Sequence, residues 1–527
     1  MGCLYFPQYR KGRDGVELFE GTLLEHAQKL GVEIASECGG LGTCGRCVVR
    51  IERGEGALSD RTAAEREFNL GENERLACQA SVIDTSATVR VFMKDFGNYS
   101  ILSDSMEDKI DLDPFVHQEG RRVVHDESGD LGAHRGEIYG LAIDVGTTTV
   151  VVELVDLEDG RRLATLSRKN PQIAYGNDVI SRIGYTMEHE GGLKQLQKVV
   201  VNGINELLAQ HADETGEFRD RVYEVVIVGN STMRDIFFGQ KVESLGVIPY
   251  EAGNLDPLHA TARQIGLRVN PSCQVYGPAL IGGHAGSDAL ADIIAAGMHL
   301  DDAVNVMIDI GTNGEVAIGN SKKMMTASCA AGGAYEGATV SCGTGAIEGA
   351  IKNVWLHNGR VDYETIGNKP AVGVCGSGLI DLLAELLRTE TMSRKAKLRD
   401  DFEISEKIKL TQEDIYELIT AKAGLRADQD LLMKYYGVDI SAVQRMYLAG
   451  GFGNFINVEN AALIGLLPDA ASKTARIGNA ALAGARAMLL SKSTREESEE
   501  LARSIEHAKP NEREPDFPYI VAENMYF

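Results

Sequence analysis

The chain has 527 residues, of which 44% are hydrophobic and 25% charged, so it is too long for one hydrophobic core and should divide into about three or four globular units. Its formal net charge of −24 argues against general nucleic-acid binding, because neutralising a phosphate backbone takes clustered Lys and Arg. The first residues lack a signal-peptide pattern and no apolar run is long enough to span a bilayer, so we expect a cytoplasmic protein without membrane association.

Four cysteines organise the first predicted unit, residues 1–97. Five residues separate Cys38 from Cys44 and two separate Cys44 from Cys47, which is one residue longer than the plant-type ferredoxin spacing but keeps its order. The glycines between them suit a loop folded over an inorganic cluster, because glycine adopts positive φ without penalty. With Cys78 as the fourth ligand, the pattern predicts a [2Fe-2S] cluster. A structural zinc site and unrelated buried cysteines are the alternatives, but zinc ribbons usually pair two C-x-x-C knuckles and only one is present.

Short predicted elements surround these cysteines. In chain order they are a hairpin at 4–6 and 16–18, a helix whose capping box lies at 22–25, and strands at 48–51 and 88–92. This layout is typical of a β-grasp ferredoxin, although other small α+β domains would also fit. The five-residue gap resembles that of the ferredoxins that serve vertebrate and bacterial hydroxylase systems.

Residues 98–137 are charged, rich in acidic side chains and poor in periodicity. We interpret them as a linker that would let the first unit move between an electron donor and an acceptor. An ordered strap packed on the following domain is an equally good alternative.

The sequence pattern changes at residue 138, where apolar strand patterns begin. Asp144 opens an Asp-x-Gly-Thr turn between two such runs, and the same pattern returns at Asp309. Two copies of one pattern on hairpins suggest a duplicated fold with two facing lobes. We therefore expect a first lobe over residues 138–303 and a second, ending in helices, over residues 304–527.

The chemistry of these two turns suits phosphate. Glycine lets the backbone approach an oxyanion, successive N–H groups point inward, and threonine hydroxyls add donors. The carboxylate beside each turn, Asp144 or Asp309, can hold Mg²⁺ through water. One such turn is weak evidence, because ordinary hairpins use the same residues, but two copies with a third glycine turn are stronger.

The third turn contains Gly450, Gly451 and Gly453 and follows a predicted strand. Its bare glycines would let an adenine ring lie against the backbone. No Walker-type phosphate loop occurs in the sequence, so a P-loop is unsupported.

Two phosphate turns followed by an adenosine turn are similar to the superfamily of acetate and sugar kinases, Hsp70 and actin. Joined to the N-terminal [2Fe-2S] domain, the whole chain resembles the reductive activators of corrinoid-dependent methyltransferases, and the likeness includes residues 336–338, 374–379 and 517–527. The implied fold is a β-grasp [2Fe-2S] ferredoxin domain followed by a two-lobed α/β actin-like ATPase with duplicated ribonuclease-H-like lobes. The implied activity is ATP-dependent reductive activation of a corrinoid protein, in which one electron from the cluster converts inactive Co(II) to Co(I).

The resemblance also implies cofactors, partners and site residues. The cofactors are the [2Fe-2S] cluster, ATP and Mg²⁺, and the partners are a corrinoid protein of a methyltransferase system and an upstream electron donor. The implied catalytic residues are Asp144, Asp309 and Glu315, with Glu315 positioning the attacking water. The implied nucleotide-binding residues are Gly146, Thr147, Thr148, Thr149, Gly311, Thr312, Asn313, Gly314, Gly450, Gly451 and Gly453. Longer members of the family carry an extra small domain after the ferredoxin, and the linker here leaves no room for it. A homodimer is a further possible partner, but not through an interface supplied by that domain.

Two other functions compete with this hypothesis. One is an ATP-driven electron donor to a radical dehydratase, suggested by the same phosphate turns and by Cys329 downstream of the second turn. Such donors bind a [4Fe-4S] cluster between subunits and lack an N-terminal ferredoxin domain. The other is a small-molecule kinase or an ATP-dependent binding module with a redox-sensing domain.

Overall fold

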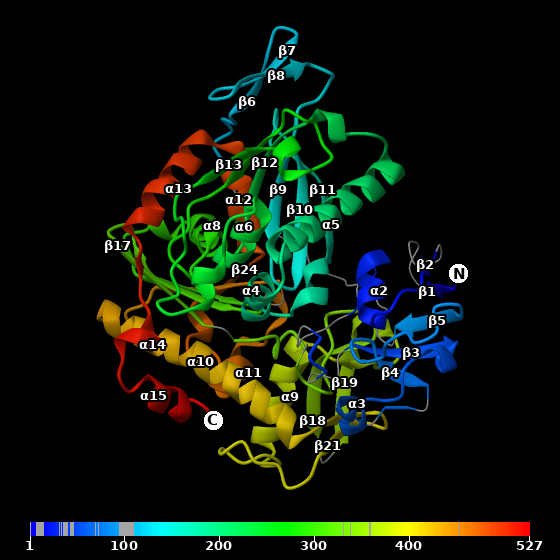
Figure 1. Ribbon diagram of the computed structural model, residues 1–527. Coiled ribbons are helices and arrows are strands. Elements are labelled where there is room, and N and C mark those ends of the chain that lie inside the picture. Colours follow the sequence, from blue (N-terminus) through cyan, green and yellow to red (C-terminus); the bar gives the residue numbers. More distant parts are fainter. Residues whose placement is uncertain are drawn as a thin grey trace. The chain divides into compact units, whose positions relative to one another are not determined.

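The chain forms two compact units. Unit 1 combines residues Met1–Asn98 with Asn170–Val200, and unit 2 combines Tyr99–Lys169 with Val201–Phe527. The computed structural model describes residues 2–6, 15–30, 32, 34, 40–42, 47–68, 70–71, 73–93, 110–329, 331–337, 339–357, 360–451 and 453–527 (Figure 1).

The N-terminal part of unit 1 is a five-stranded sheet in the order β2-β1-β5-β3-β4. The β1 and β5 strands run parallel, and the other neighbours run antiparallel. A capping box starts the first helix, because Thr22 Oγ1 accepts from Glu25 N at 3.2 Å and Glu25 Oε2 accepts from Thr22 N at 2.6 Å. The predicted hairpin, helix and strands are confirmed, and the arrangement is a β-grasp fold. The elements are β1 (Cys3–Tyr5), β2 (Val16–Glu17), α2 (Leu23–Leu30), β3 (Val48–Arg53), α3 (Ala63–Glu67), β4 (Glu74–Leu76) and β5 (Thr88–Met93).

Residues 170–200 belong to unit 1, although the sequence analysis assigned them to the first ATPase lobe. They contain the 3-10 helix η2 (Pro171–Tyr175), the helix α4 (Val179–Glu188) and the start of α5 (Gly192–Thr215). A grouping of this kind depends on contacts between distant segments, so local periodicity does not reveal it.

Unit 2 contains two six-stranded sheets that share the topology of five strands. The first has the order β11-β10-β9-β12-β14-β13 and the second β24-β23-β15-β16-β17-β25. In each sheet three successive strands pair antiparallel, a later strand adds in parallel beside the first of the three, and a second later strand adds in parallel beside that one. The sixth strand differs, because β13 pairs antiparallel with β14 whereas β25 pairs parallel with β17 at the other edge. The predicted duplication is therefore confirmed. The strands are β9 (Tyr139–Val145), β10 (Thr149–Asp156), β11 (Arg162–Lys169), β12 (Val222–Val228), β13 (Leu258–Thr261), β14 (Gln274–Gly277), β15 (Asn305–Ile310), β16 (Gly314–Asn320), β17 (Lys323–Cys329), β23 (Arg445–Ala449), β24 (Thr474–Gly478) and β25 (Glu506–His507).

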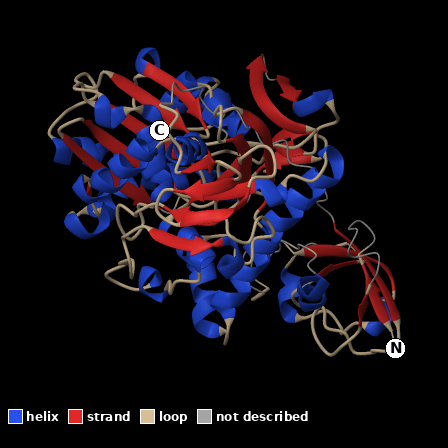
Figure 2. Ribbon diagram, turned by 90° about the horizontal axis from the view of Figure 1, so that it is seen from above, coloured by secondary structure: helices blue, strands red, loops and turns tan. Residues whose placement is uncertain are grey.

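Unit 2 also contains helices, some of which pack on these sheets and others on one another (Figure 2). They are α6 (Ser231–Phe238), α7 (Ala262–Ile265), α8 (Ser287–Ala296), α9 (Gly376–Arg388), α10 (Gln412–Tyr436), α11 (Val458–Leu463), α12 (Ala480–Leu490), α13 (Lys492–Ser504), α14 (Pro510–Arg513) and α15 (Phe517–Glu523). Smaller sheets are formed by β18 (Ala350–His357), β19 (Arg360–Thr365) and β20 (Gly373–Val374), and by β21 (Phe402–Ser405) and β22 (Ile408–Leu410). Among the described residues, no helix combines the length and apolar character that crossing a bilayer requires.

The helices α8 and α12 join the two halves of unit 2, because each of them packs on the sheet of the other half. The α8 helix belongs to the first half but packs with Met307 and Ala317 of the second sheet, whereas α12 packs on the first sheet. The two helices touch through their backbones, because a Cβ on Gly484 would lie 2.1 Å from Ala291 O. Only glycine permits this approach, so the crossing holds the halves together.

Residues 110–137 form the ordered strap, the second of the two predicted alternatives. They contain a three-stranded antiparallel sheet, and Val116, Val123 and Leu131 are buried in the same core as α12. A flexible tether is therefore the wrong interpretation of this part, and residues 98–109 lie outside the described residues. The strands are β6 (Val116–Glu119), β7 (Arg122–His125) and β8 (Gly129–Ala133).

A buried ion pair ties the strap and α13 to the first sheet of unit 2. Arg495 of α13 lies 2.7 Å from Glu224 of β12, and both side chains are buried. The guanidinium carbon also lies 4.3 Å from the ring centroid of Phe115 in the strap and 4.4 Å from that of Tyr276. Burial alone would raise the pKa of Glu224, but Arg495 and His125 together hold it below its usual value.

We predict that Arg495→Ala destabilises unit 2 by about 3–5 kcal/mol, because the substitution leaves the buried Glu224 carboxylate without a cation. Arg503→Ala on the same helix is the matched control. Arg503 lies 3.8 Å from Glu499, and the Arg503 side chain is 62% exposed. Loss of this ion pair should therefore cost less than about 1 kcal/mol. Urea denaturation of the full chain measures both, and equal midpoints for the two variants would contradict the prediction.

Candidate iron-sulfur and nucleotide sites

Two of the four predicted cluster ligands meet in unit 1. Cys47 directly precedes β3 and Cys78 follows β4, and the pairing of Val48 with Leu76 brings their side chains together. The two sulfur atoms are 3.3 Å apart and both residues are buried. A disulfide would need about 2.05 Å, whereas two thiolates on one tetrahedral metal ion with bonds of about 2.3 Å lie about 3.8 Å apart. The pair therefore fits a metal-sulfur site. The other two ligands, Cys38 and Cys44, lie outside the described residues.

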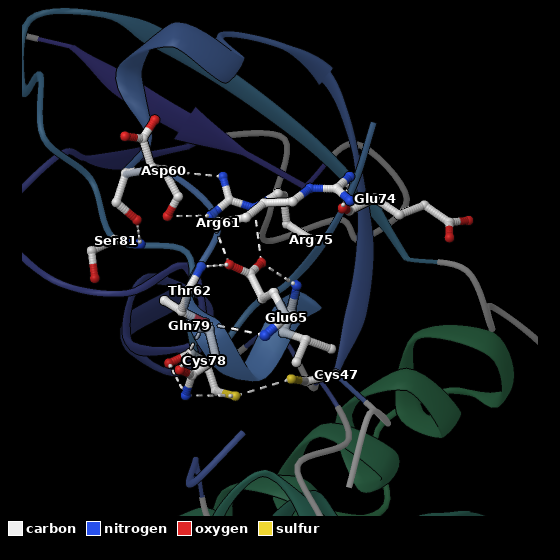
Figure 3. A network of polar contacts seen from close by, with 12 residues as sticks. Cys47, Asp60, Arg61, Thr62, Glu65, Glu74, Arg75, Cys78, Gln79 and Ser81 are labelled. Carbon is white, nitrogen blue, oxygen red and sulfur yellow. Dashed lines mark hydrogen bonds and ion pairs between the residues drawn. The ribbon is translucent and has the colours of Figure 1, made fainter. Parts of the chain in front are cut away.

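Gln79 connects this pair to the glycine-rich loop (Figure 3). Its Nε2 atom donates to Gly40 O at 3.2 Å and lies 3.7 Å from Cys78 Sγ, and its Oε1 accepts from Thr62 Oγ1 at 3.3 Å. A Cβ on Gly42 would come within 2.7 Å of this side chain, so glycine is required there. The sequence analysis missed Gln79, although its place directly after Cys78 was a visible signal.

A buried ion pair between Arg75 and Glu65 lies in the same region of unit 1. Arg75 Nε donates to Glu65 Oε1 at 2.8 Å, and Glu65 Oε2 accepts from Thr62 N at 3.0 Å (Figure 3). Burial would raise the pKa of Glu65, but the hydrogen bonds, chiefly from Arg75, lower it below its usual value. Hydrogen bonds thus run from the ion pair through Thr62 to Gln79 beside the sulfur of Cys78.

The two phosphate turns of unit 2 lie against each other. Asp144 is the penultimate residue of β9 and Asp309 that of β15, so the two turns leave equivalent strands of the duplicated sheets. Thr148 Oγ1 of the first turn is 2.7 Å from Thr312 Oγ1 of the second. Residues 164 positions apart therefore offer hydroxyl groups at one place.

Glu336 binds both hydroxyls. Its Oε2 atom accepts from Thr148 Oγ1 at 2.9 Å and from Thr312 Oγ1 at 2.5 Å. Burial raises the pKa of Glu336, while the two threonines and Lys169 act in the opposite direction. The sequence analysis named Glu336 only as part of the family likeness and gave it no role at the site.

The backbone of each turn is tightly constrained. A Cβ on Gly146 would lie 2.8 Å from Thr149 O, and one on Gly314 would lie 2.6 Å from the Leu425 side chain. In the second turn Gly311 N donates to Asn313 O at 3.1 Å. Thr147 is positioned differently from its neighbours, because its hydroxyl accepts from Asn230 Nδ2 at 3.0 Å.

Buried carboxyl groups lie close together beside the turns. Burial raises the pKa of Asp144 to about 7, with Asn479 opposing the shift and the charge of Asp309 adding to it. Asn479 Nδ2 donates to Asp144 Oδ2 at 3.0 Å. Burial likewise raises the pKa of Asp309 to about 6. Burial therefore disfavours the charged form of both carboxylates that are predicted to hold Mg²⁺.

Helix α8 adds two more acids. Burial raises the pKa of Asp288 to about 7 and, helped by nearby carboxylates, that of Asp292 well above its usual value. Asp292 and Asp309 act on each other in opposite directions, because Asp309 raises the pKa of Asp292 and Asp292 lowers that of Asp309. Among the described residues, no three His, Cys, Asp or Glu side chains are placed to hold a metal ion together.

Glu315 is a buried residue on β16. It is the cross-strand partner of Asp309 and accepts from Ser328 Oγ at 3.5 Å. Burial, together with the charges of Asp288 and Asp309, raises its pKa well above the usual value, which favours the neutral acid.

The third glycine turn adjoins the second phosphate turn. The parallel pairing of β15 with β23 places Ala449 beside Asp309, and the turn starts at the next residue. Gly450 has a φ of 97°, and a Cβ there would lie 2.5 Å from Asp309 Oδ1. Gly451 has open space where its Cβ would be, whereas a Cβ on Gly453 would lie 3.4 Å from Leu448. The predicted adenosine turn thus lies beside a predicted phosphate turn.

We predict that nucleotide binding with Mg²⁺ weakens by about tenfold between pH 8 and pH 6, because the ionised fraction of a carboxyl group with a pKa near 7 falls about tenfold over that range. Asp144 has that pKa, and its ionised form is the one that binds a cation. Calorimetric titration with Mg²⁺ and a non-hydrolysable ATP analogue measures the affinity. Asp144→Asn in the same buffers is the control for titration of the nucleotide itself, and an unchanged pH slope in that variant would contradict the assignment.

Comparison with known proteins agrees with this architecture. Residues 13–82 match the 2Fe-2S iron-sulfur cluster binding domain, residues 139–301 match the RACo middle region, and residues 303–527 match the C-terminal domain of RACo, the ASKHA domain. A solved structure described as a reductive activator for corrinoid,iron-sulfur protein superposes with a TM-score of 0.73 at 28% identity, covering 100% of this chain and 98% of that one.

Two curated relatives are similar over most of the chain. A corrinoid activation enzyme, RamQ, from Eubacterium limosum is 34% identical over 385 residues, which are 67% of this chain and 65% of that protein. This chain therefore spans slightly less than two thirds of that relative. A [Co(II) methylated amine-specific corrinoid protein] reductase from Methanosarcina barkeri is 25% identical over 402 residues, 70% of this chain and 73% of that protein. With a cluster-binding domain before the two matched RACo regions, the chain belongs to the RACo family.

Proposed function

We propose that the protein uses ATP to drive one electron from its [2Fe-2S] cluster onto the cobalt of a corrinoid protein, converting inactive Co(II) to Co(I) in a methyltransferase system. One observation carries the proposal. The chain combines a buried sulfur pair at 3.3 Å in a β-grasp domain with two phosphate turns whose hydroxyls meet at 2.7 Å in a duplicated ATPase fold. The printed functions of the similar proteins support it.

The need for ATP follows from redox energetics. When bound, a plant-type [2Fe-2S] cluster supplies an electron near about −400 mV. The Co(II)/Co(I) couple is expected to lie lower, and a one-electron equilibrium shifts tenfold for each ~59 mV. Nucleotide binding would overcome this difference by favouring a conformation of the complex in which cobalt is more easily reduced, provided that ATP binds that conformation more tightly.

The residues of unit 2 divide the work of nucleotide binding. Asp144 and Asp309 hold Mg²⁺ through water, and the hydroxyls of Thr148 and Thr312 donate to phosphate oxygens. Gly450, Gly451 and Gly453 receive the adenosine, together with the remaining glycines and hydroxyls of the two predicted turns. Glu315 is kept as the group that positions the attacking water, and burial together with nearby carboxylates raises its pKa.

The cysteines of unit 1 hold the cluster. Cys47 and Cys78 supply two thiolates, and Cys38 and Cys44 supply the other two. An upstream reductant is a required partner, the cytoplasm is the proposed compartment, and a homodimer is compatible with the family resemblance.

The test is anaerobic absorbance of a Co(II) corrinoid protein mixed with the reduced protein, with and without ATP. We predict a Co(I) spectrum only when ATP is present. We also predict that Cys78→Ser abolishes this reduction while nucleotide binding stays within twofold of wild type, because the cysteines and phosphate turns belong to separate units.

Cys3→Ser is the matched control, since Cys3 lies on β1 of the same unit and is not a predicted ligand. It should retain both the cluster absorbance and cobalt reduction. Unchanged cobalt with several corrinoid proteins, while the cluster stays intact, would overturn the proposed function. Loss of nucleotide binding in Cys78→Ser would overturn the separation of the two sites.

A further inference from the structure

Glu336 occupies the place where the two phosphate turns meet. A single carboxylate oxygen, Oε2, accepts a hydrogen bond from each of Thr148 and Thr312. These are the hydroxyls that the proposed function assigns to the phosphates of ATP. The inference below rests on that function, because it concerns the same site.

The number of available protons makes the two roles exclusive. Each threonine hydroxyl has one proton, so each can donate to only one acceptor at a time. While Thr148 and Thr312 both donate to Glu336, neither has a proton left for a phosphate oxygen. The carboxylate and a phosphate oxygen are both anionic acceptors, which form short charge-assisted bonds with hydroxyl groups.

Charge also separates Glu336 from a bound phosphate. Glu336 already interacts unfavourably with Asp309, whose pKa it raises, and only Lys169 opposes this among the charged groups acting on Glu336. Adding the charge of a terminal phosphate at the same hydroxyls would place two anions in contact. One of them must leave.

The backbone around Glu336 is anchored, which leaves the side chain as the part that can move. Tyr335 is buried, and Gly337, with a φ of 75°, lies against the next loop so closely that a Cβ would be 2.3 Å from Thr344 O. Glu336 N also donates to Gly333 O at 3.2 Å. A change of side-chain rotamer would release both threonines without unfolding the loop.

We propose that Glu336 is an internal substitute for the terminal phosphate of ATP. In the nucleotide-free protein its carboxylate links the two phosphate turns, and the terminal phosphate takes over both hydroxyls when ATP binds. The exchange distinguishes ATP from ADP, because only ATP brings a third phosphate to replace the carboxylate. Glu336 therefore lowers the affinity for ATP and leaves that for ADP nearly unchanged.

The test is calorimetric titration of the full chain with the Mg²⁺ complexes of a non-hydrolysable ATP analogue and of ADP. Glu336→Ala should bind the ATP analogue about tenfold more tightly, because the hydrogen bonds to a charged acceptor no longer compete. Its affinity for ADP should stay within twofold of wild type. Glu336→Gln keeps the size of the side chain and should give a smaller change in the same direction. Glu348→Ala, an exposed glutamate of the same half, is the control and should change neither affinity.

A double-substitution cycle separates this exchange from a general effect of charge. In a Thr148→Val/Thr312→Val background, Glu336→Ala should no longer tighten binding of the ATP analogue. Equal tightening for the ATP analogue and ADP, or weaker binding of the analogue by both Glu336 variants, would overturn the inference. Absence of any nucleotide binding by the wild-type chain would instead overturn the proposed function, and with it this inference.

Discussion

The proposed nucleotide site depends on a crowding of carboxyl groups beside the two predicted phosphate turns. Asp144 and Asp309 lie at the ends of equivalent strands, and α8 adds Asp288 and Asp292. Burial raises the pKa of all four, which disfavours their charged forms. A divalent cation would favour those charged forms, because its charge removes the repulsion that burial amplifies. We propose that Mg²⁺, bound together with the nucleotide, offsets the electrostatic repulsion among these buried carboxylates.

The exchange of helices between the two halves creates this crowding. The α8 helix packs on the second sheet, where Asp288 and Asp292 both interact with Asp309, and Asp288 also interacts with Asp144 of the first sheet. The contact of Gly484 with Ala291 fixes the crossing of α12 over α8, and α12 begins directly after Asn479, whose amide binds Asp144. The helix contacts and the polar contacts of the site therefore share the same elements. A conformational change that separates the halves must alter both, and this coupling is what an ATP-driven activator requires.

Local sequence patterns predicted the repeated parts of this structure well. The features that they did not predict depend on contacts between residues far apart in the sequence. The Asp-x-Gly-Thr turns, the glycine turn at Gly450 and the capping box at Thr22 are each encoded within a few neighbouring residues. Glu336 and Asn479 reach their partners only through the fold, so no neighbouring residue in the sequence indicates their contacts, whereas Gln79 had one local signal in its place directly after Cys78. For residues 110–137 the sequence left a tether and an ordered strap open, because surface charges outnumber the few buried residues, such as Val123 and Leu131, that anchor the strap. All four cluster ligands stay predictions: the sulfur atoms of Cys47 and Cys78 lie together, and Cys38 and Cys44 lie outside the described residues.

The central claim is that the acid-lined site provides the bias for an electron transfer whose redox site lies in another unit. Asp309→Asn tests it most directly, because the substitution removes one predicted Mg²⁺-binding carboxylate while leaving the cysteines untouched. The measurement is the yield of Co(I) in a corrinoid protein per ATP hydrolysed, with the absorbance of the [2Fe-2S] cluster recorded in the same cuvette. The account predicts an unchanged cluster spectrum, loss of ATP hydrolysis and no Co(I). Formation of Co(I) at the wild-type rate by this variant would contradict it.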